Sequence, residues 1–142
     1  MALSANKSRE YAPTNPDAQV RHPVAASGYV YQGSMVGLVA GSGYARALTA
    51  GDYFAGFAQE EVDNASGSAG DQEVQVLEHG VVWFAAITGA SGLADVSKEV
   101  FASDDATLTL TAGSNSSVGR ISAYDATRGF AVRFGAASTR LT

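Results

Sequence analysis

A short block of residues occurs twice in this chain of 142 residues, and the repeat limits the fold more than any single residue does. Each copy is typical of a β-branched or aromatic strand, a glycine-containing turn and a second strand that contains a glycine. The first copy is YVY at 29–31, ALTAG at 47–51 and GFA at 56–58; the second is EVF at 99–101, TLTAG at 109–113 and GRI at 119–121. The repeat predicts a β fold built by internal duplication, and nothing in it is typical of a catalytic motif.

From residue 27 to residue 142 the sequence keeps this β character. Alternating or continuous apolar runs predict strands, and glycine-rich or aspartate-rich stretches predict the turns between them. The predicted strands are 29–31, 34–39, 44–48, 53–58, 73–77, 81–87, 100–101, 107–110, 118–124 and 129–134. We expect residues 62–71 to form a long loop and the apolar run at 81–87 to be buried on both faces. The pattern predicts an all-β domain, an antiparallel β-sandwich or a small β-barrel.

Residues 1–26 differ from the rest, because they are polar, lack periodicity and contain all three prolines. Proline fixes φ and removes a backbone donor, so this segment predicts an extended N-terminal arm outside the β domain. Such an arm is either a disordered tail or a segment that orders against a partner. The residues we expect to contact that partner are Tyr11, Pro13, Pro16, Val20, Arg21, His22 and Pro23.

Composition narrows the possible partners. The chain has no cysteine, which excludes disulfides and thiolate metal sites, and its formal net charge of -5 disfavours binding to nucleic acid. The first residues lack the pattern of a signal peptide, and the longest apolar run is too short to span a bilayer. We expect a protein made in the cytoplasm that binds neither nucleic acid nor membrane.

The titratable residues do not form a recognisable catalytic motif. His22 and His79 are the only histidines, and Asp104 and Asp105 read as turn residues rather than as a calcium or hydrolase pair. We therefore expect no enzymatic activity, no cofactor, no metal and no small-molecule substrate. Trp83, the only tryptophan, reads as a core residue or as an interface anchor.

Three segments resemble the β-rich decoration, or cement, proteins of tailed-bacteriophage capsids. They are KEVFASDDATLTLT at 98–111, SSVGRI at 116–121 and RGFAVRF at 128–134, and the resemblance extends over residues 28–134. Gly33, the GLV at 37–39 and the ALTAG at 47–51 are similar to the opening of that family. These motifs are structural, so the resemblance rests on spacing and composition.

The resemblance implies a non-enzymatic virion protein on the outer surface of the phage head. It would bind as a trimer or dimer and bridge neighbouring major capsid protein subunits, which stabilises the head against packed DNA. The alternative is a carbohydrate- or receptor-binding β module on a virion surface, with Tyr29, Tyr31, Tyr44 and Tyr53 as an aromatic platform. A small β-fold hydrolase that uses the acidic residues is a third alternative.

Overall fold

The computed structural model of the chain describes residues 2–12 and 18–139. Within them the regular structure is β, apart from two short 3-10 turns, η2 (Leu93–Asp95) and η3 (Ala137–Thr139). The strands are β1 (Gln19–Pro23), β2 (Gly28–Val30), β3 (Met35–Leu38), β4 (Ala45–Ala47), β5 (Tyr53–Ala58), β6 (Val62–Asn64), β7 (Glu73–Leu77), β8 (His79–Phe84), β9 (Glu99–Ala102), β10 (Leu108–Thr109), β11 (Ser116–Asp125) and β12 (Gly129–Gly135). The predicted all-β class is confirmed. In the described residues, no helix is long and apolar enough to cross a membrane.

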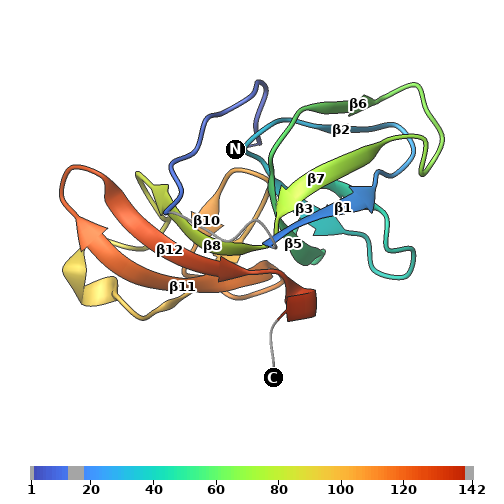
Figure 1. Ribbon diagram of the computed structural model, residues 1–142. Coiled ribbons are helices and arrows are strands. Elements are labelled where there is room, and N and C mark those ends of the chain that lie inside the picture. Colours follow the sequence, from blue (N-terminus) through green and yellow to red (C-terminus); the bar gives the residue numbers. More distant parts are fainter. Residues whose placement is uncertain (1, 13–17, 140–142) are drawn as a thin grey trace.

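Ten of these strands form two antiparallel sheets with the same connectivity. The first sheet has the order β1-β7-β5-β3-β4, and the second, read from its β8 edge, has the order β8-β12-β11-β9-β10. In Figure 1 the second sheet lies at the lower left and the first at the right, with the small β2–β6 pair above the first. Only β2 and β6 lack a counterpart, so the predicted duplication is confirmed at the level of topology.

The two sheets also share a β-bulge at the same place. In the first, Val36 lies opposite Gly56 and Gly37 opposite Phe54, which leaves one residue of β5 unpaired. In the second, Val100 lies opposite Gly119 and the next pair skips one residue of β11 in the same way. This shared register makes β3 of the first sheet the counterpart of β9 in the second. The pairing of residues 29–31 with 99–101 that the sequence repeat suggested is therefore wrong, because residues 28–30 form β2 outside the duplicated sheet.

Each sheet curls until its first strand returns to its last. An isolated parallel bridge joins Val24, just after β1, to Ala45 of β4, and a second joins Thr88, after β8, to Thr109 of β10. The Thr88 N–H donates to the Leu108 carbonyl at 2.9 Å. The molecule therefore consists of two small barrel-like β units of common topology, a form that closes most of the sheet edges.

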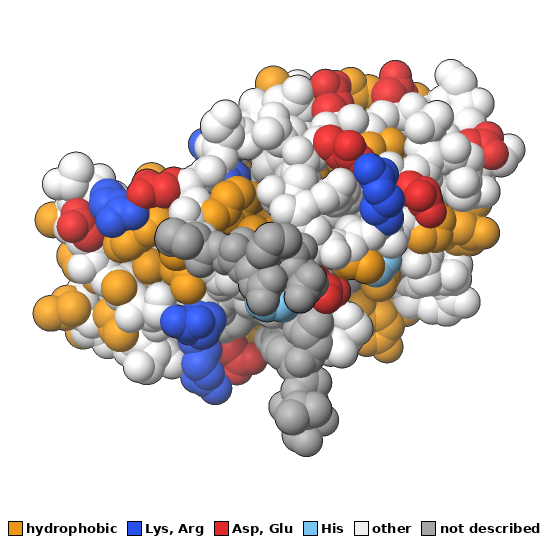
Figure 2. All heavy atoms as spheres, in the orientation of Figure 1, with side chains coloured by type: hydrophobic (Ala, Val, Ile, Leu, Met, Phe, Trp, Pro, Cys, Tyr) orange, Lys and Arg blue, Asp and Glu red, His pale blue; other side chains and the backbone are white. Residues whose placement is uncertain are grey.

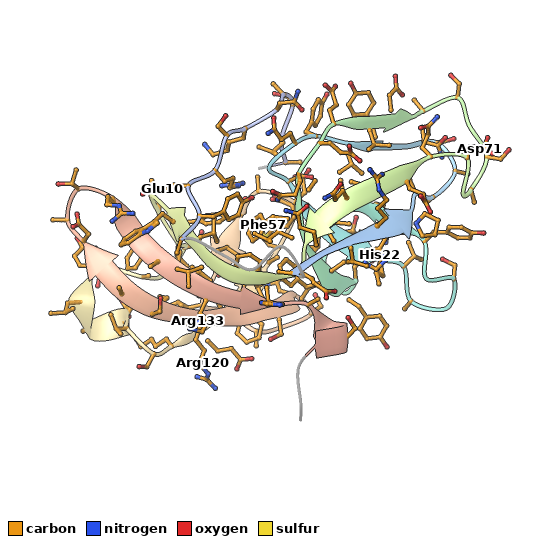
Figure 3. All side chains as sticks on the ribbon, viewed as in Figure 1. Glu10, His22, Phe57, Asp71, Arg120 and Arg133 are labelled. Atoms are coloured by element: carbon orange, nitrogen blue, oxygen red, sulfur yellow. The ribbon has the colours of Figure 1, made fainter. Side chains whose placement is uncertain are left out.

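The bulge in β5 determines how the two units pack. Because side chains alternate along a strand, residues three apart normally face opposite ways, but the extra residue in a bulge reverses this. Phe54 and Phe57 thus share one face and contact Phe134 of β12, with ring centroids 6.1 and 4.8 Å away. Figure 3 shows Phe57 between the two groups of strands. The opposite face of the first sheet packs under Val30 and Val62 of the β2–β6 pair.

Two further predictions fail, one of a buried strand and one of a loop. Residues 81–87 are not buried on both faces: Val82 and Phe84 are buried, while Ala85 and Ala86 are exposed. The predicted loop at 62–71 begins with β6, which pairs with β2.

Candidate functional site

Residues 2–12 form an extended segment that crosses both β units, and this segment organises the most distinctive surface of the molecule. The Lys7 N–H donates to the Gln32 carbonyl of the first unit at 2.8 Å. On the second unit, the Ala12 N–H donates to the Val81 carbonyl at 3.0 Å, and the Trp83 N–H donates to the Glu10 carbonyl at 3.1 Å. Residues 10–12 therefore add an antiparallel strand to the β8 edge.

Arg9 inserts from this segment into the seam between the units. Its Nε donates to the Gly33 carbonyl at 2.7 Å, and its guanidinium carbon lies 4.4 Å from the centroid of Phe84 and 5.6 Å from that of Phe57. Its Nη2 is buried without a hydrogen-bond partner. Burial lowers the pKa of Arg9, and the nearby charge of Asp105 opposes this shift. The sequence analysis missed Arg9, since its role depends on rings contributed by distant strands.

Tyr11, one of the predicted contact residues, packs against its own chain. It lies opposite Val82, and its ring packs edge-on against Phe57 and Phe134 at centroid distances of 6.2 and 6.5 Å. Burial raises the pKa of its hydroxyl, which accepts a long hydrogen bond from Gln59 at 3.4 Å. Tyr11 thus anchors the N-terminal segment to the seam between the units.

Four other predicted contact residues lie in β1, so they belong to the first sheet and not to an arm. Val20 packs against the core of the first unit, and burial lowers the pKa of His22. Pro23 ends the strand, and Arg21 is exposed and pairs with Glu60 at 3.5 Å.

The predicted boundary between an arm at 1–26 and a domain at 27–142 is therefore wrong. Ala18 and Val24, on either side of β1, are fully buried, and β1 pairs with β7 along its length. Residues 19–23 form a strand although they follow a proline-containing stretch, because β7 supplies the backbone hydrogen bonds. Pro13 and Pro16 lie outside the described residues.

β1 and β8 are equivalent edges, but only β8 is covered. The Val24 N–H donates to Gln72 and the Ala18 carbonyl accepts from Glu78, so the even-numbered residues of β1 face β7. Because the pattern alternates, the N–H and C=O groups of Gln19 and Arg21 point away from β7. Among the described segments none pairs with that edge between Gln19 and Pro23. The first unit therefore offers an open strand edge where the second has residues 10–12.

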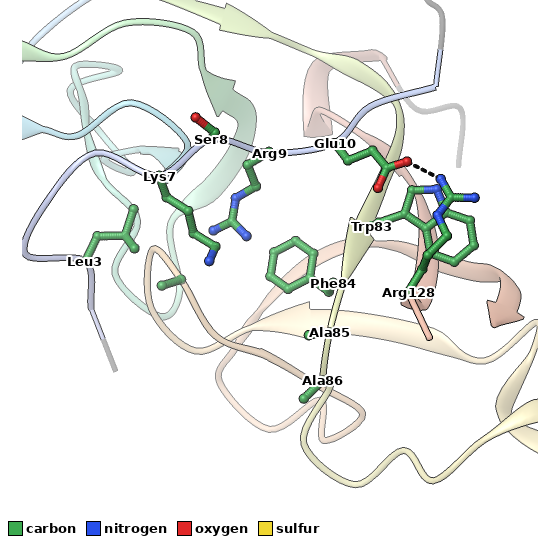
Figure 4. Close-up of a pocket in the computed structure, with 11 residues that line it drawn as sticks. Leu3, Lys7, Ser8, Arg9, Glu10, Trp83, Phe84, Ala85, Ala86 and Arg128 are labelled. Atoms are coloured by element: carbon green, nitrogen blue, oxygen red, sulfur yellow. Dashed lines mark hydrogen bonds and ion pairs between the residues drawn. The ribbon is translucent and has the colours of Figure 1, made fainter. Parts of the chain in front are cut away.

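A cavity of about 470 Å³ opens where the N-terminal segment separates from β8. Figure 4 shows Lys7 and Arg9 pointing into it from one side, with the Phe84 ring below them. At one end Glu10 pairs with Arg128, whose guanidinium carbon lies 3.8 Å from the centroid of the Trp83 ring. Trp83 is thus half-buried beside a cavity instead of lying in the core.

The acidic charge gathers elsewhere, at the β6–β7 end of the first unit. In Figure 2 acidic side chains occupy the upper right of the molecule. A groove there is lined by Arg21, Glu60, Glu61, Asp63, Asp71 and Glu73. In residues 2–12 and 18–139, no group of three or more histidine or carboxylate side chains could hold a metal ion.

The two aspartates at 104 and 105 serve the backbone. Asp104 accepts hydrogen bonds from the N–H groups of Ala106 and Thr107, both at 2.8 Å. The Asp105 carboxylate accepts from the Leu3 N–H at 3.0 Å and is buried. The two aspartates lie in a turn, as predicted. This turn contacts the N-terminal segment through the bond to Leu3.

Comparison of the chain with protein-family models, with curated proteins and with solved structures finds no match.

Proposed function

We propose that the chain is a non-enzymatic structural protein that binds repeated protein surfaces through its β units. More specifically, we propose a decoration protein of a tailed-phage capsid, which lies on the outer surface of the head and bridges neighbouring major capsid protein subunits. It would act as a trimer or dimer, be made in the host cytoplasm and become part of the virion.

The observation that carries this proposal is the duplication of the edge strand. The units share strand order and bulge position, so β1 and β8 are similar edges held in one molecule. The β8 edge already pairs with an extended segment, which supports the idea that such an edge accepts a strand. Because β8 is covered, one molecule offers one such open edge, and the proposed dimer or trimer would bring several of these edges to neighbouring copies of the capsid subunit. Several weak contacts then combine through effective concentration.

The β1 edge is the point at which we expect the capsid to bind. Gln19 and Arg21 are exposed, and their outward N–H and C=O groups can bond an extended segment of a capsid subunit. Backbone bonds of this kind give affinity without conspicuous side chains, which fits a surface poor in charge. This replaces the free arm as the binding element.

Cosedimentation tests the proposal. Purified protein is mixed with expanded, undecorated heads of the phage that carries this sequence, and the pellet is quantified over a range of protein concentrations. We expect saturable binding at a fixed ratio to the major capsid protein. If nothing sediments with the heads at micromolar concentrations, the capsid function is rejected.

One observation favours the carbohydrate-binding alternative. Tyr29 and Tyr31 form a tilted pair with ring centroids 4.8 Å apart, and the Tyr29 hydroxyl donates to Glu61. Tyr29 is partly exposed, so the pair offers an aromatic surface beside a carboxylate. Tyr53 lies instead beside Leu38 and Ala137, in a different groove. If the protein bound a glycan array in the absence of heads and Tyr29→Ala abolished that binding, carbohydrate binding would become the favoured function.

A further inference from the structure

The cavity beside the N-terminal segment gathers more positive than negative charge, since Lys7, Arg9 and Arg128 line it together with the single carboxylate of Glu10. Lys7 and Arg9 are two residues apart in an extended segment, so they share one side and both line the cavity. Among the described residues no ion pair to Lys7 is found, and Nη2 of Arg9 has no hydrogen-bond partner. A buried polar group without a partner is rare in folded proteins, so an unpaired guanidinium nitrogen calls for an explanation.

The carboxylates near the cavity are engaged elsewhere. Glu10 lines the cavity but pairs with Arg128. Asp105 raises the pKa of Arg9 through its charge, yet its Oδ1 accepts from the Leu3 N–H. Three cations, Lys7, Arg9 and Arg128, thus lie against two carboxylates, and this leaves an excess of positive charge in a protein whose formal net charge is -5.

Apolar side chains form much of the remaining cavity wall, beside Ser8 and the Glu10–Arg128 pair. Leu3, Trp83, Phe84, Ala85 and Ala86 line it, and the small side chains at 85 and 86 leave space open. A volume of about 470 Å³ suits a small molecule or one large side chain. Arg9 is positioned by its bond to Gly33 and by the Phe84 ring, so one of the two cations is held in place before any ligand arrives.

We propose that this cavity binds a carboxylate carried on an apolar or aromatic body. The carboxylate would lie against Lys7 and Arg9, and the body would pack on Trp83 and Ala85. Two cationic donors suit a singly charged group, whereas a phosphate dianion in an apolar cavity would leave oxygens without donors. The site goes beyond capsid binding and does not depend on it.

Trp83 provides the readout, because it is the only tryptophan and lines the cavity. Its fluorescence is followed while the full-length protein is titrated with benzoate, acetate or inorganic phosphate at constant ionic strength. We expect a saturable change in fluorescence with benzoate, at lower concentrations than acetate or phosphate would require. Lys7→Ala should weaken benzoate binding about tenfold, the effect of losing one charged hydrogen bond, and Lys7→Arg should keep most of it.

Arg133→Ala is the matched control, because Arg133 is exposed and does not line the cavity. It removes one positive charge as Lys7→Ala does, and we expect unchanged benzoate affinity. The proposal is overturned if benzoate gives no saturable change, if phosphate binds as tightly as benzoate, or if Lys7→Ala and Arg133→Ala weaken binding equally.

Discussion

Gly56 and Gly119 occupy the same bulge in the two sheets, and neither position has room for a side chain. A Cβ at Gly56 would lie 2.3 Å from the Leu77 carbonyl oxygen, and one at Gly119 would lie 2.0 Å from that of Arg133. Both distances are far below van der Waals contact. Close approach of the neighbouring strand therefore explains why the repeat places a glycine at each position.

Gly119→Ala should destabilise the protein by about 1–3 kcal/mol, because the neighbouring backbone must shift to admit the methyl group. Gly92→Ala is the control, since its backbone is extended and the nearest atoms to its Cβ would be ring carbons of Tyr124 at 3.9 Å. Urea denaturation measures both. If the two variants were equally stable, the backbone around the β11 bulge would accommodate a methyl group without a cost in stability.

Asp95 fixes the turn that precedes β9. Its carboxylate accepts from Lys98 Nζ at 2.7 Å and from the N–H groups of Ser91 and Gly92 at 2.7 and 3.2 Å. These bonds, that of Lys98 foremost, lower the pKa of Asp95 to about 2. A depressed carboxylate pKa contributes stability above the unfolded-state value, and this contribution is lost as the pH falls from about 4 through about 2.

Asp95→Asn should lower the melting temperature at pH 7 and flatten its decline between pH 4 and pH 2. Thermal unfolding at several pH values measures this. Asp125→Asn is the comparison, because Asp125 also accepts backbone bonds but lies at an exposed turn. If the Asp95→Asn curve stays parallel to that of the native protein below pH 4, then Asp95 does not carry the acid sensitivity.

At the scale of the element, the N-terminal segment joins the two units. It bonds to Gln32 and Gly33 in one unit and to Val81 and Trp83 in the other, and it places Tyr11 on the seam. β1 follows as part of the first sheet. The two parts of residues 1–26 thus have different roles, which gives two deletions with different outcomes.

Removal of residues 2–12 should leave a folded protein of lower stability, since burial of Tyr11 alone is worth about 1.5–3 kcal/mol. Removal of residues 1–26 should abolish folding, because β7 loses one of its two neighbouring strands and the cores around Ala18 and Val24 open to water. Circular dichroism with thermal denaturation distinguishes the two. If the longer deletion melted cooperatively near the native temperature, β1 would not be part of the stable fold.

The sequence predicted individual strands better than their partners. β5 and β7 begin and end where the sequence placed them, because polar or turn-forming residues flank each of these apolar runs. β1 was missed because its polar residues and Pro23 resemble those of an extended arm, and only the pairing with β7 makes it a strand. The cavity could not be foreseen, since Arg9 and Phe84 are distant in sequence and meet only through the fold.

At the scale of the whole molecule, duplication provides the architecture, and we propose that it also serves the function. Two units with the same topology pack through Phe57 and Phe134. Of their equivalent edges, β8 pairs with residues 10–12, whereas none of the described segments pairs with the outer edge of β1. We propose that the covered β8 edge stabilises the molecule and that the open β1 edge binds a capsid subunit. An oligomer of such molecules would contact several subunits at once, which raises avidity without strong single contacts.

The most direct measurement compares Arg21→Pro with Arg21→Ala in cosedimentation with undecorated heads. Both substitutions remove the exposed side-chain contacts of Arg21 with Glu60 and Gln75, but only proline also removes the outward backbone N–H, and it leaves the bonds of β1 to β7 intact. We predict that Arg21→Pro binds the heads at least about tenfold more weakly than Arg21→Ala, which should bind nearly as the native protein does. Equal binding of the two variants would contradict the role of the β1 edge, and the absence of native binding would contradict the capsid function itself.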